Sequence, residues 1–274
     1  MVYICTALYE EAEPFIEKLK LKKNLNITKF QVFESDEYRL MICGVGKIKA
    51  SIAVTYMLSI FKPSHRDVFI NVGICGTSNM NFQIGEIFII NKILDKDTYR
   101  SYFPDIIFKH EFKESQLVSA SAVEKNIMEK DKFDLVDMEA SSVYEAAVTF
   151  MQTNQVIFIK IISDYLEVNN LDKSFICSLM SGASEKICSW LQSIKSWNQY
   201  IPSFTEEEKN IIEKVTLNLR LSETMKNEFI QYTKYYRLNH GEILNVLETY
   251  RSMECKSRNE GKRYLAEIKQ KLIS

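Results

Sequence analysis

Short apolar runs alternate with amphipathic segments over the first two thirds of the chain. Apolar residues at helical spacing predict helices over residues 10–21, 47–61, 140–151 and 173–194. Continuous apolar runs predict strands over residues 2–8, 27–33, 38–43, 67–72, 84–90, 135–138 and 156–162. Strands that alternate with helices indicate an α/β layered fold, in which ligands bind where strands end and helices begin.

The pattern changes after Trp197. Thr205 and Glu208 have the spacing of a capping box, which predicts that a helix opens there. From that point strand patterns disappear, and further helices are predicted to start near Ser222 and near residues 239–241. We therefore expect two domains, an α/β domain over residues 1–198 and an all-helical C-terminal extension over residues 203–274.

Composition narrows the class of protein. The chain has 274 residues, of which 46% are hydrophobic and 26% charged, and a formal net charge of −1. These values are typical of a globular protein and argue against a nucleic-acid footprint over the whole chain. The first residues carry acids where the core of a signal peptide would continue, and the six cysteines form no C-x-x-C pair. We expect a cytoplasmic protein with reduced thiols and no membrane contact.

The eight glycines are unevenly distributed, since Gly44, Gly46, Gly73, Gly76 and Gly85 fall in one stretch. Such a concentration predicts that the backbone approaches something closely there. No third glycine completes a dinucleotide loop after residue 46, and no Walker A loop exists. The three histidines are far apart without companion ligands, so we expect no metal and no cofactor.

Several acids stand at the predicted ends of strands. Glu10 and Glu11 follow the first strand, Asp137 and Glu139 flank a strand-to-helix junction, and Asp164 follows the last apolar strand. Acids at such places also serve as helix caps or partners of the helix dipole. Their residue type alone leaves both interpretations open.

Five segments occur in an order that is typical of one superfamily: TALYEEA (6–12), CGVGKIKAS (43–51), FINVGICG with IGEI (69–76, 84–87), VDMEASSV (136–143) and IKIISD (159–164). On these motifs the chain resembles the nucleoside phosphorylase/nucleosidase superfamily, and within it the 5′-methylthioadenosine/S-adenosylhomocysteine nucleosidase branch. The resemblance covers about residues 1–198. It implies a three-layer α/β/α fold around a mixed, partly barrel-like sheet, and cleavage of an N-ribosidic bond.

The resemblance also implies roles for individual residues. Glu11 matches the carboxylate that activates the attacking water. Met138 and Glu139 match the pair beside the ribose, with Glu139 holding its hydroxyl groups. Asp164 matches the acid that protonates purine N7, and Ser163 supports its placement.

The remaining substrate-binding candidates come from the same comparison. Gly76 matches a backbone position that lines the sugar pocket, with Cys75 beside it. Lys160 stands where nucleosidases have an arginine near the water, and Ile74 where they usually have a serine. Val123 takes the place of an aromatic residue against the base, and an acid follows it at Glu124.

Asn71 bears on whether water or phosphate attacks the nucleoside, because related phosphorylases carry a phosphate-binding arginine at this position. The N-terminal turn also has acids in place of their phosphate loop. We therefore expect hydrolysis of a purine nucleoside, such as 5′-methylthioadenosine, S-adenosylhomocysteine or 5′-deoxyadenosine, in nucleoside catabolism or methionine salvage. One alternative is a phosphorylase that uses Lys47, Lys49 or Lys160. Another is a catalytically impaired nucleoside-binding or scaffold protein.

The resemblance further implies a homodimer. The helical extension is predicted to pack on the catalytic domain or its dimer mate, or to dock a protein partner. Its basic end, with Tyr232, Tyr235 and Tyr236 nearby, is typical of a solvated helix face rather than of a nucleic-acid site.

Overall fold

The computed structural model describes residues 1–121, 133–166, 172–200 and 204–273. These residues divide into two compact units, Met1–Ile194 and Lys195–Ser274, each with its own hydrophobic core. We describe the two units separately.

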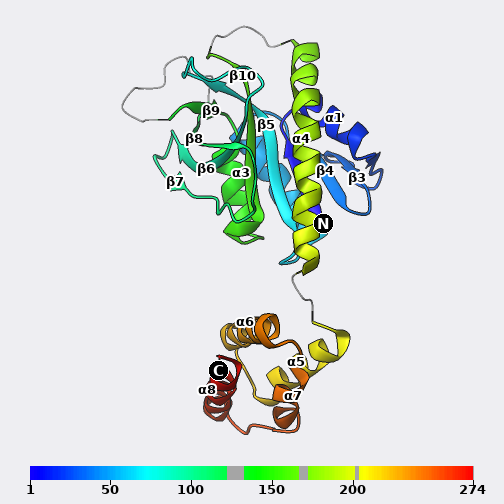
Figure 1. The fold of residues 1–274 in the computed structure, drawn as a ribbon, viewed down its shortest axis with the longest axis vertical. Helices are drawn as coiled ribbons and strands as arrows, with labels where there is room; N and C mark the ends of the chain where they lie inside the picture. Colours follow the sequence, from blue (N-terminus) through cyan, green and yellow to red (C-terminus); the bar gives the residue numbers. More distant parts are fainter. Residues whose placement is uncertain (122–132, 167–171, 201–203, 274) are drawn as a thin grey trace. The chain divides into compact units, whose positions relative to one another are not determined.

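One mixed sheet forms the middle of the first unit (Figure 1). The described residues contribute ten strands to it: β1 (Val2–Thr6), β2 (Lys22–Lys23), β3 (Gln31–Glu34), β4 (Tyr38–Ile42), β5 (Val68–Thr77), β6 (Ile87–Asp95), β7 (Ser101–Tyr102), β8 (Lys113–Ser119), β9 (Leu135–Asp137) and β10 (Val156–Asp164). Strands β5, β10, β6, β8 and β9 pair in sequence, and β9 pairs back onto β5. This closed ring, with β1, β4 and β3 continuing from β5, confirms the expected partly barrel-like sheet.

Helices cover both faces of the sheet. On one face, α1 (Tyr9–Lys18) and α4 (Lys173–Tyr200) share a core with the apolar side chains of β1, β4, β5 and β10. On the other face, α2 (Lys47–Phe61) and α3 (Ala140–Val148) pack on each other and on the opposite side of the same strands. The predicted three-layer α/β/α class is therefore confirmed.

Several element boundaries differ from the predicted ones. Strand β5 continues through Gly73 to Thr77, because β10 pairs with it as far as Gly76 and β9 pairs with Gly76 and Thr77. The predicted strand at 27–33 begins only at Gln31. Strand β8 was not anticipated, because its KESQ start is polar, but it pairs in parallel with β6. Helix α3 ends at Val148, three residues before the predicted end.

The second unit consists of helices α5 (Glu206–Asn218), α6 (Glu223–His240), α7 (Leu244–Leu247) and α8 (Arg258–Ile273) around one apolar core. The predicted capping box is present, since Glu208 N–H donates to Thr205 Oγ1 and Thr205 N–H donates to the Glu208 carboxylate. A helix start was predicted near Ser222, and Ser222 is the N-cap residue of α6. Within the described ranges, none of the helices is both long and apolar enough to cross a membrane.

Candidate active site

The carboxyl ends of β1, β9 and β10 bring the predicted acids to one edge of the sheet around β5. Glu11 lies in the first turn of α1 after β1, Glu139 caps α3 after β9, and Asp164 ends β10. Strands β1 and β10 run parallel to β5, so their carboxyl ends lie at the edge where α/β sheets bind ligands. Strand β9 runs antiparallel to β5 and pairs with Gly76 and Thr77 at that edge. The segment from Gly73 to Gly76 in β5 lies at the centre of this group.

Glu11 is 2% exposed and receives three backbone hydrogen bonds. Ala7 N–H and Leu8 N–H donate to its Oε2 at 2.8 and 2.9 Å, and Ile74 N–H donates to its Oε1 at 2.9 Å. Burial raises the pKa of Glu11, and these donors together with the charge of Lys160 oppose the rise. An ionised carboxylate accepts about four hydrogen bonds, so a lone pair on Oε1 is left to meet a water molecule.

Gly73 explains how Ile74 N–H comes so close to Glu11. A Cβ atom at residue 73 would lie 3.0 Å from Glu11 Oε1. The absent side chain therefore provides the space in which the carboxylate sits. The clustering of glycines predicted this kind of close approach.

Glu139 is held by the turn that opens α2. Gly46 N–H donates to Glu139 Oε1 at 2.7 Å, and Gly46 has φ +99°, a conformation that favours glycine. Burial, followed by the charge of Asp137, raises the pKa of Glu139 to about 7, while Lys160 and the Gly46 amide oppose the rise. This carboxyl is therefore poised between its two forms near neutral pH.

Lys160 forms a buried ion pair between β10 and β9. Its Nζ lies 2.8 Å from Asp137 Oδ2, and the two side chains are 2% and 1% exposed. Burial lowers the pKa of Lys160, but the charges of Asp137 and Glu139 outweigh it and raise the pKa overall. Asp137 Oδ2 also accepts the N–H of Ala140 at the start of α3. Lys160 thus supplies positive charge beneath the acids.

A β-bulge sets the direction of Asp164. The pairing of β10 with β5 shifts between Ile162 and Asp164, so Ser163 is the extra residue and Asp164 comes opposite Gly76. Asp164 Oδ1 accepts Leu166 N–H at 2.8 Å, and its Oδ2 lies 2.7 Å from Ser163 Oγ. Ser163 Oγ also lies 3.1 Å from the carbonyl oxygen of Cys75.

One hydroxyl proton cannot serve both neighbours of Ser163 at once. Ser163 Oγ can donate either to Asp164 Oδ2 or to the Cys75 carbonyl oxygen, and it therefore links Asp164 to strand β5.

Gly76 brings β5 against the last residues of β10. A Cβ atom at residue 76 would lie 2.6 Å from Leu166 Cδ2 and 3.0 Å from Asp164 Oδ1. Leu166 has φ +62°, and its N–H donates back to Asp164. The alignment of Asp164 thus depends on the missing side chain at residue 76.

The remaining predicted residues that the structure describes make no side-chain hydrogen bond to the three acids. Met138 is half-buried beside Glu139, while the Cys75 side chain is 3% exposed and packs in the core. Val123 and Glu124 lie outside the described residues. No group of three or more His, Cys, Asp or Glu side chains suited to a metal ion occurs in the described part of the chain.

Sequence reasoning missed three contributors, which are the Gly46 amide, Asp137 as the partner of Lys160, and Leu166. The glycine cluster and the acid at the end of a strand were signals for the first two. Nothing in the sequence pattern pointed to the backbone conformation of Leu166.

Comparison with known proteins finds relatives that share one name. No protein-family model matches the chain. The 5′-methylthioadenosine/S-adenosylhomocysteine nucleosidase of Maridesulfovibrio salexigens is 28% identical over 164 residues, which cover 56% of this chain and 67% of the relative. The enzyme of that name from Staphylococcus epidermidis is 31% identical over 107 residues, 38% of this chain and less than half (46%) of the relative.

Solved structures share the fold. The Arabidopsis thaliana 5′-methylthioadenosine nucleosidase superposes with a TM-score of 0.59 at 17% identity, covering 70% of this chain and 95% of that one. A futalosine hydrolase from Helicobacter pylori superposes with a TM-score of 0.56 at 15% identity, covering 70% and 97%. In sequence and in fold, the chain is therefore similar to the 5′-methylthioadenosine/S-adenosylhomocysteine nucleosidases of the nucleoside phosphorylase superfamily.

Proposed function

We propose that the chain hydrolyses the N-glycosidic bond of a purine nucleoside, and that its substrate is a 5′-modified adenosine. The observation that carries this proposal is that Glu11 lies against Gly73 and Asp164 against Gly76. Glu139 follows strand β9, which pairs with Gly76, and its carboxyl group interacts electrostatically with Glu11. Three residues of strand separate the Gly73 and Gly76 contacts by roughly 10 Å. That separation leaves room for a sugar beside Glu11 and a base beside Asp164. The names of the relatives support the same chemistry.

The reaction needs a base on the sugar side. The oxygen of a water molecule attacks C1′ while Glu11 Oε1 takes a proton from it. The three amide donors fix the Glu11 carboxylate, and burial strengthens it as a base by raising its pKa.

The reaction also needs an acid on the base side. As the C1′–N9 bond breaks, its electron pair moves to the purine, and Asp164 gives a proton to N7. The products are the free base and ribose or its 5′-modified form, and exchange with solvent returns the proton from Glu11 to Asp164. Glu139 accepts hydrogen bonds from the ribose hydroxyl groups and faces the positive charge that develops on the sugar.

Water is favoured over phosphate as the acceptor. Asn71 is 2% exposed and donates its amide to the Cys5 carbonyl within the sheet. Two of the three lysines that the phosphorylase alternative could use, Lys47 and Lys160, are paired with carboxylates. A phosphate ion beside Glu11 would meet carboxylates without a free guanidinium partner.

Free-base release tests the proposal directly. Purified protein is incubated with 5′-methylthioadenosine, S-adenosylhomocysteine, 5′-deoxyadenosine, adenosine, inosine or futalosine, each with and without phosphate, and chromatography measures the base. Equal release in both conditions supports the hydrolase and ranks the substrates. Release only with phosphate shows a phosphorylase. Ligand-induced thermal stabilisation without release shows a nucleoside-binding protein.

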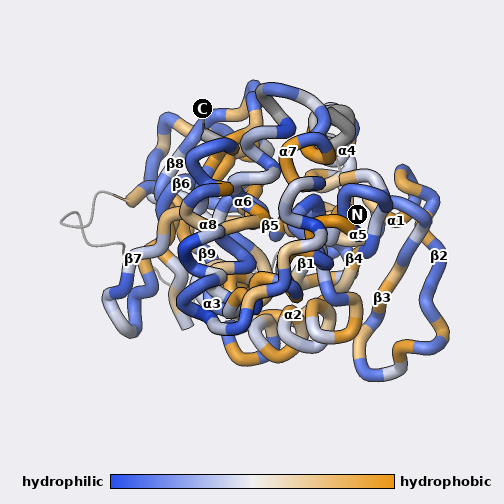
Figure 2. Tube along the Cα trace, turned by 90° about the horizontal axis from the view of Figure 1, so that it is seen from below, coloured by the Kyte–Doolittle hydropathy of each residue, from blue (hydrophilic) through white to orange (hydrophobic). Residues whose placement is uncertain are grey.

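We further infer a cytoplasmic homodimer that acts in methionine salvage or nucleoside catabolism. Helix α2 is coloured hydrophobic over much of its length in Figure 2, and its residues Ile48, Ile52 and Ile60 are exposed. A second copy that covers this face would remove that apolar surface from water. Sedimentation of the full chain tests this inference, because a monomer at micromolar concentration contradicts it. We also infer that residues 203–274 bind a protein partner.

A further inference from the structure

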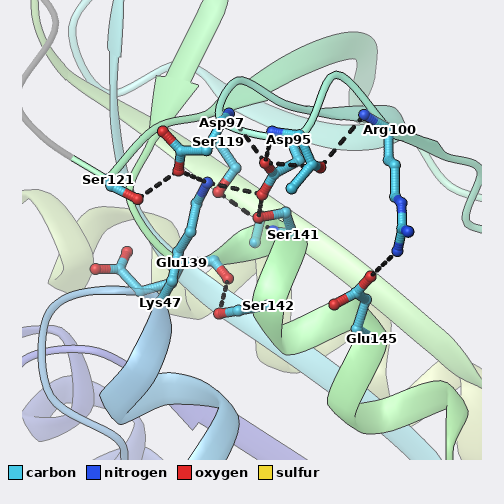
Figure 3. A network of polar contacts seen from close by, with 12 residues as sticks. Lys47, Asp95, Asp97, Arg100, Ser119, Ser121, Glu139, Ser141, Ser142 and Glu145 are labelled. Carbon is cyan, nitrogen blue, oxygen red and sulfur yellow. Dashed lines mark hydrogen bonds and ion pairs between the residues drawn. The ribbon is translucent and has the colours of Figure 1, made fainter.

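A second cluster of charged and hydroxyl side chains lies beside Glu139 (Figure 3). Lys47, the first residue of α2, places its Nζ 2.7 Å from Asp95 Oδ2 and 2.6 Å from Asp97 Oδ2. The Lys47 and Asp95 side chains are 14% and 9% exposed. Burial lowers the pKa of Lys47, but the two carboxylates outweigh it, so the ammonium stays charged.

Asp95 connects Lys47 to the start of α3. Ser141 Oγ donates to Asp95 Oδ2 at 2.6 Å, and Ser141 N–H donates to Ser119 Oγ at 3.2 Å. Asp95 Oδ1 is occupied separately by the backbone of Asp97 and by Thr98. Asp95 Oδ2 therefore accepts from both Lys47 and Ser141 and bridges the two side chains.

The same two helix starts hold Glu139. Gly46 immediately precedes Lys47, and Glu139 lies two residues before Ser141. Two parallel links thus join α2 to α3, one through Gly46 N–H and Glu139 Oε1 and one through Lys47, Asp95 and Ser141. Figure 3 shows the contacts that join Lys47, Asp95 and Ser141, with Glu139 nearby.

The first link has little support of its own. Gly46 is the N-cap residue of α2, it has no side chain, and no side-chain hydrogen bond caps that helix. Its φ of +99° is one that the backbone readily leaves when nothing holds it. The adjacent ion pair adds a polar contact between this turn and α3, beside the apolar packing of the two helices.

We propose that Lys47 is a positioning residue for the reaction, which through Asp95 and Ser141 keeps the Gly46 amide on Glu139 and so aligns the ribose anchor. This inference rests on the proposed function, because it assigns Glu139 to the sugar. Lys47 touches no reacting atom. It acts on the distance between the Gly46 amide and the Glu139 carboxylate, which binds the sugar.

The test compares Lys47→Met with Lys47→Arg, using Lys18→Met as a matched control. Lys18 also pairs with a carboxylate, Glu185, but on α1 and at 3.9 Å near the surface. We expect Lys47→Met to lower kcat/KM for the nucleoside about 10- to 100-fold, with KM rising, since small misplacements of a positioning contact cost up to about 10²-fold. Lys47→Arg should recover most of the loss, and Lys18→Met should behave as wild type.

A double-mutant cycle separates positioning from a general loss of stability. If Lys47 acts through Glu139, adding Lys47→Met to Glu139→Gln lowers kcat/KM no further than Glu139→Gln alone. Full additivity of the two losses, or an unchanged kcat/KM in an active protein, overturns the inference. Should Lys47→Met fail to fold, Ser141→Ala removes the same bridge at its other end and takes its place in the cycle.

Amide hydrogen exchange at Gly46 supplies a readout that does not depend on activity. We expect faster exchange of this amide in Lys47→Met and near wild-type exchange in Lys47→Arg, at unchanged global stability. Unchanged exchange at Gly46 contradicts the inference even if the protein releases no base. Absence of base release from wild-type protein, together with faster exchange in the variant, contradicts the proposed function alone.

Discussion

At the residue scale, backbone amides hold all three proposed catalytic carboxylates. Ile74, Gly46 and Leu166 donate to Glu11, Glu139 and Asp164, respectively. Amides fixed by the main chain need no reorganisation during the reaction, which is the condition for effective electrostatic stabilisation. This arrangement makes the site sensitive to changes in backbone conformation and space.

Gly76→Ala tests that sensitivity. The new Cβ would meet Leu166 Cδ2 at 2.6 Å and Asp164 Oδ1 at 3.0 Å, so we expect Asp164 to shift and kcat to fall about 10²-fold. Gly182→Ala on α4 is the control, since its Cβ meets nothing within 4 Å. Replacing this exposed helical glycine should leave kcat unchanged and stabilise the fold by about 0.5–1 kcal/mol. Equal kcat values for both variants and wild type would refute the assigned role of Gly76.

Glu139 predicts a specific pH dependence. Its pKa is raised from 4.5 to about 7, chiefly by burial and then by Asp137. Because the ionised form is the proposed ribose anchor, kcat/KM should rise as the pH rises through about 7, and Glu139→Gln should lack this step. Groups that face Glu139, namely Asp137, Lys160 and Glu11, are unchanged in the variant.

The same shift affects stability in a defined direction. The folded state holds the Glu139 proton more tightly than the unfolded state, so unfolding free energy is lost as the pH rises from 4.5 to about 7. Glu139→Gln should therefore gain several degrees in Tm relative to wild type at pH 8, but little at pH 4.5. A difference in Tm that does not vary with pH would rule out this linkage.

At the element scale, the bulge in β10 and the ion pair between β10 and β9 set the geometry of the site. The bulge brings Asp164 opposite Gly76, and the Lys160–Asp137 pair ties β10 to the start of α3. Asp137 Oδ1 is buried and has no hydrogen-bond partner. The pair is therefore sensitive to loss of its positive member.

Lys160→Met should destabilise the first unit by about 3–5 kcal/mol, because it leaves the Asp137 carboxylate buried without its counter-charge. Urea unfolding measures this loss. The double variant Lys160→Met/Asp137→Asn, which removes both charges, should recover part of it. A loss below about 1 kcal/mol in the single variant would show that Asp137 finds another partner.

At the scale of the whole molecule, the two units have separate apolar cores. The proposed site draws its residues from the first unit alone. In the second unit, α8 approaches Leu219, the C-cap residue of α5, so closely that a Cβ at Gly261 would overlap the carbonyl oxygen of Leu219. A substitution at Gly261 can therefore disrupt the second unit without changing any residue of the first.

Gly261→Ala should unfold or strongly destabilise the second unit, since the overlap is with backbone that cannot move aside. The helical signal at 222 nm should fall, while base release per molecule stays within about twofold of wild type. Loss of base release in a variant whose first unit still melts cooperatively would show that the extension supports the site.

The sequence predicted the elements better than the contacts. Helix α2 was predicted over its full length, because its apolar spacing is regular and a proline follows it closely. Strand β8 was missed, because its stability comes from pairing with β6 and β9 rather than from an apolar pattern. The acids were singled out by their places at strand ends, whereas Gly46 and Leu166 contribute only main-chain atoms. The glycine cluster signalled the contribution of Gly46, whereas nothing in the sequence pattern signalled that of Leu166.

The most direct measurement of the central claim is the rate of base release by Asp164→Asn on the best substrate of the panel. Asp36→Asn, on an exposed turn, is the control for the loss of one carboxylate. Asparagine cannot give N7 a proton, so the account predicts a fall in kcat of about 10²–10⁴-fold with an unchanged Tm, and wild-type kcat for Asp36→Asn. Wild-type kcat in Asp164→Asn would contradict the account.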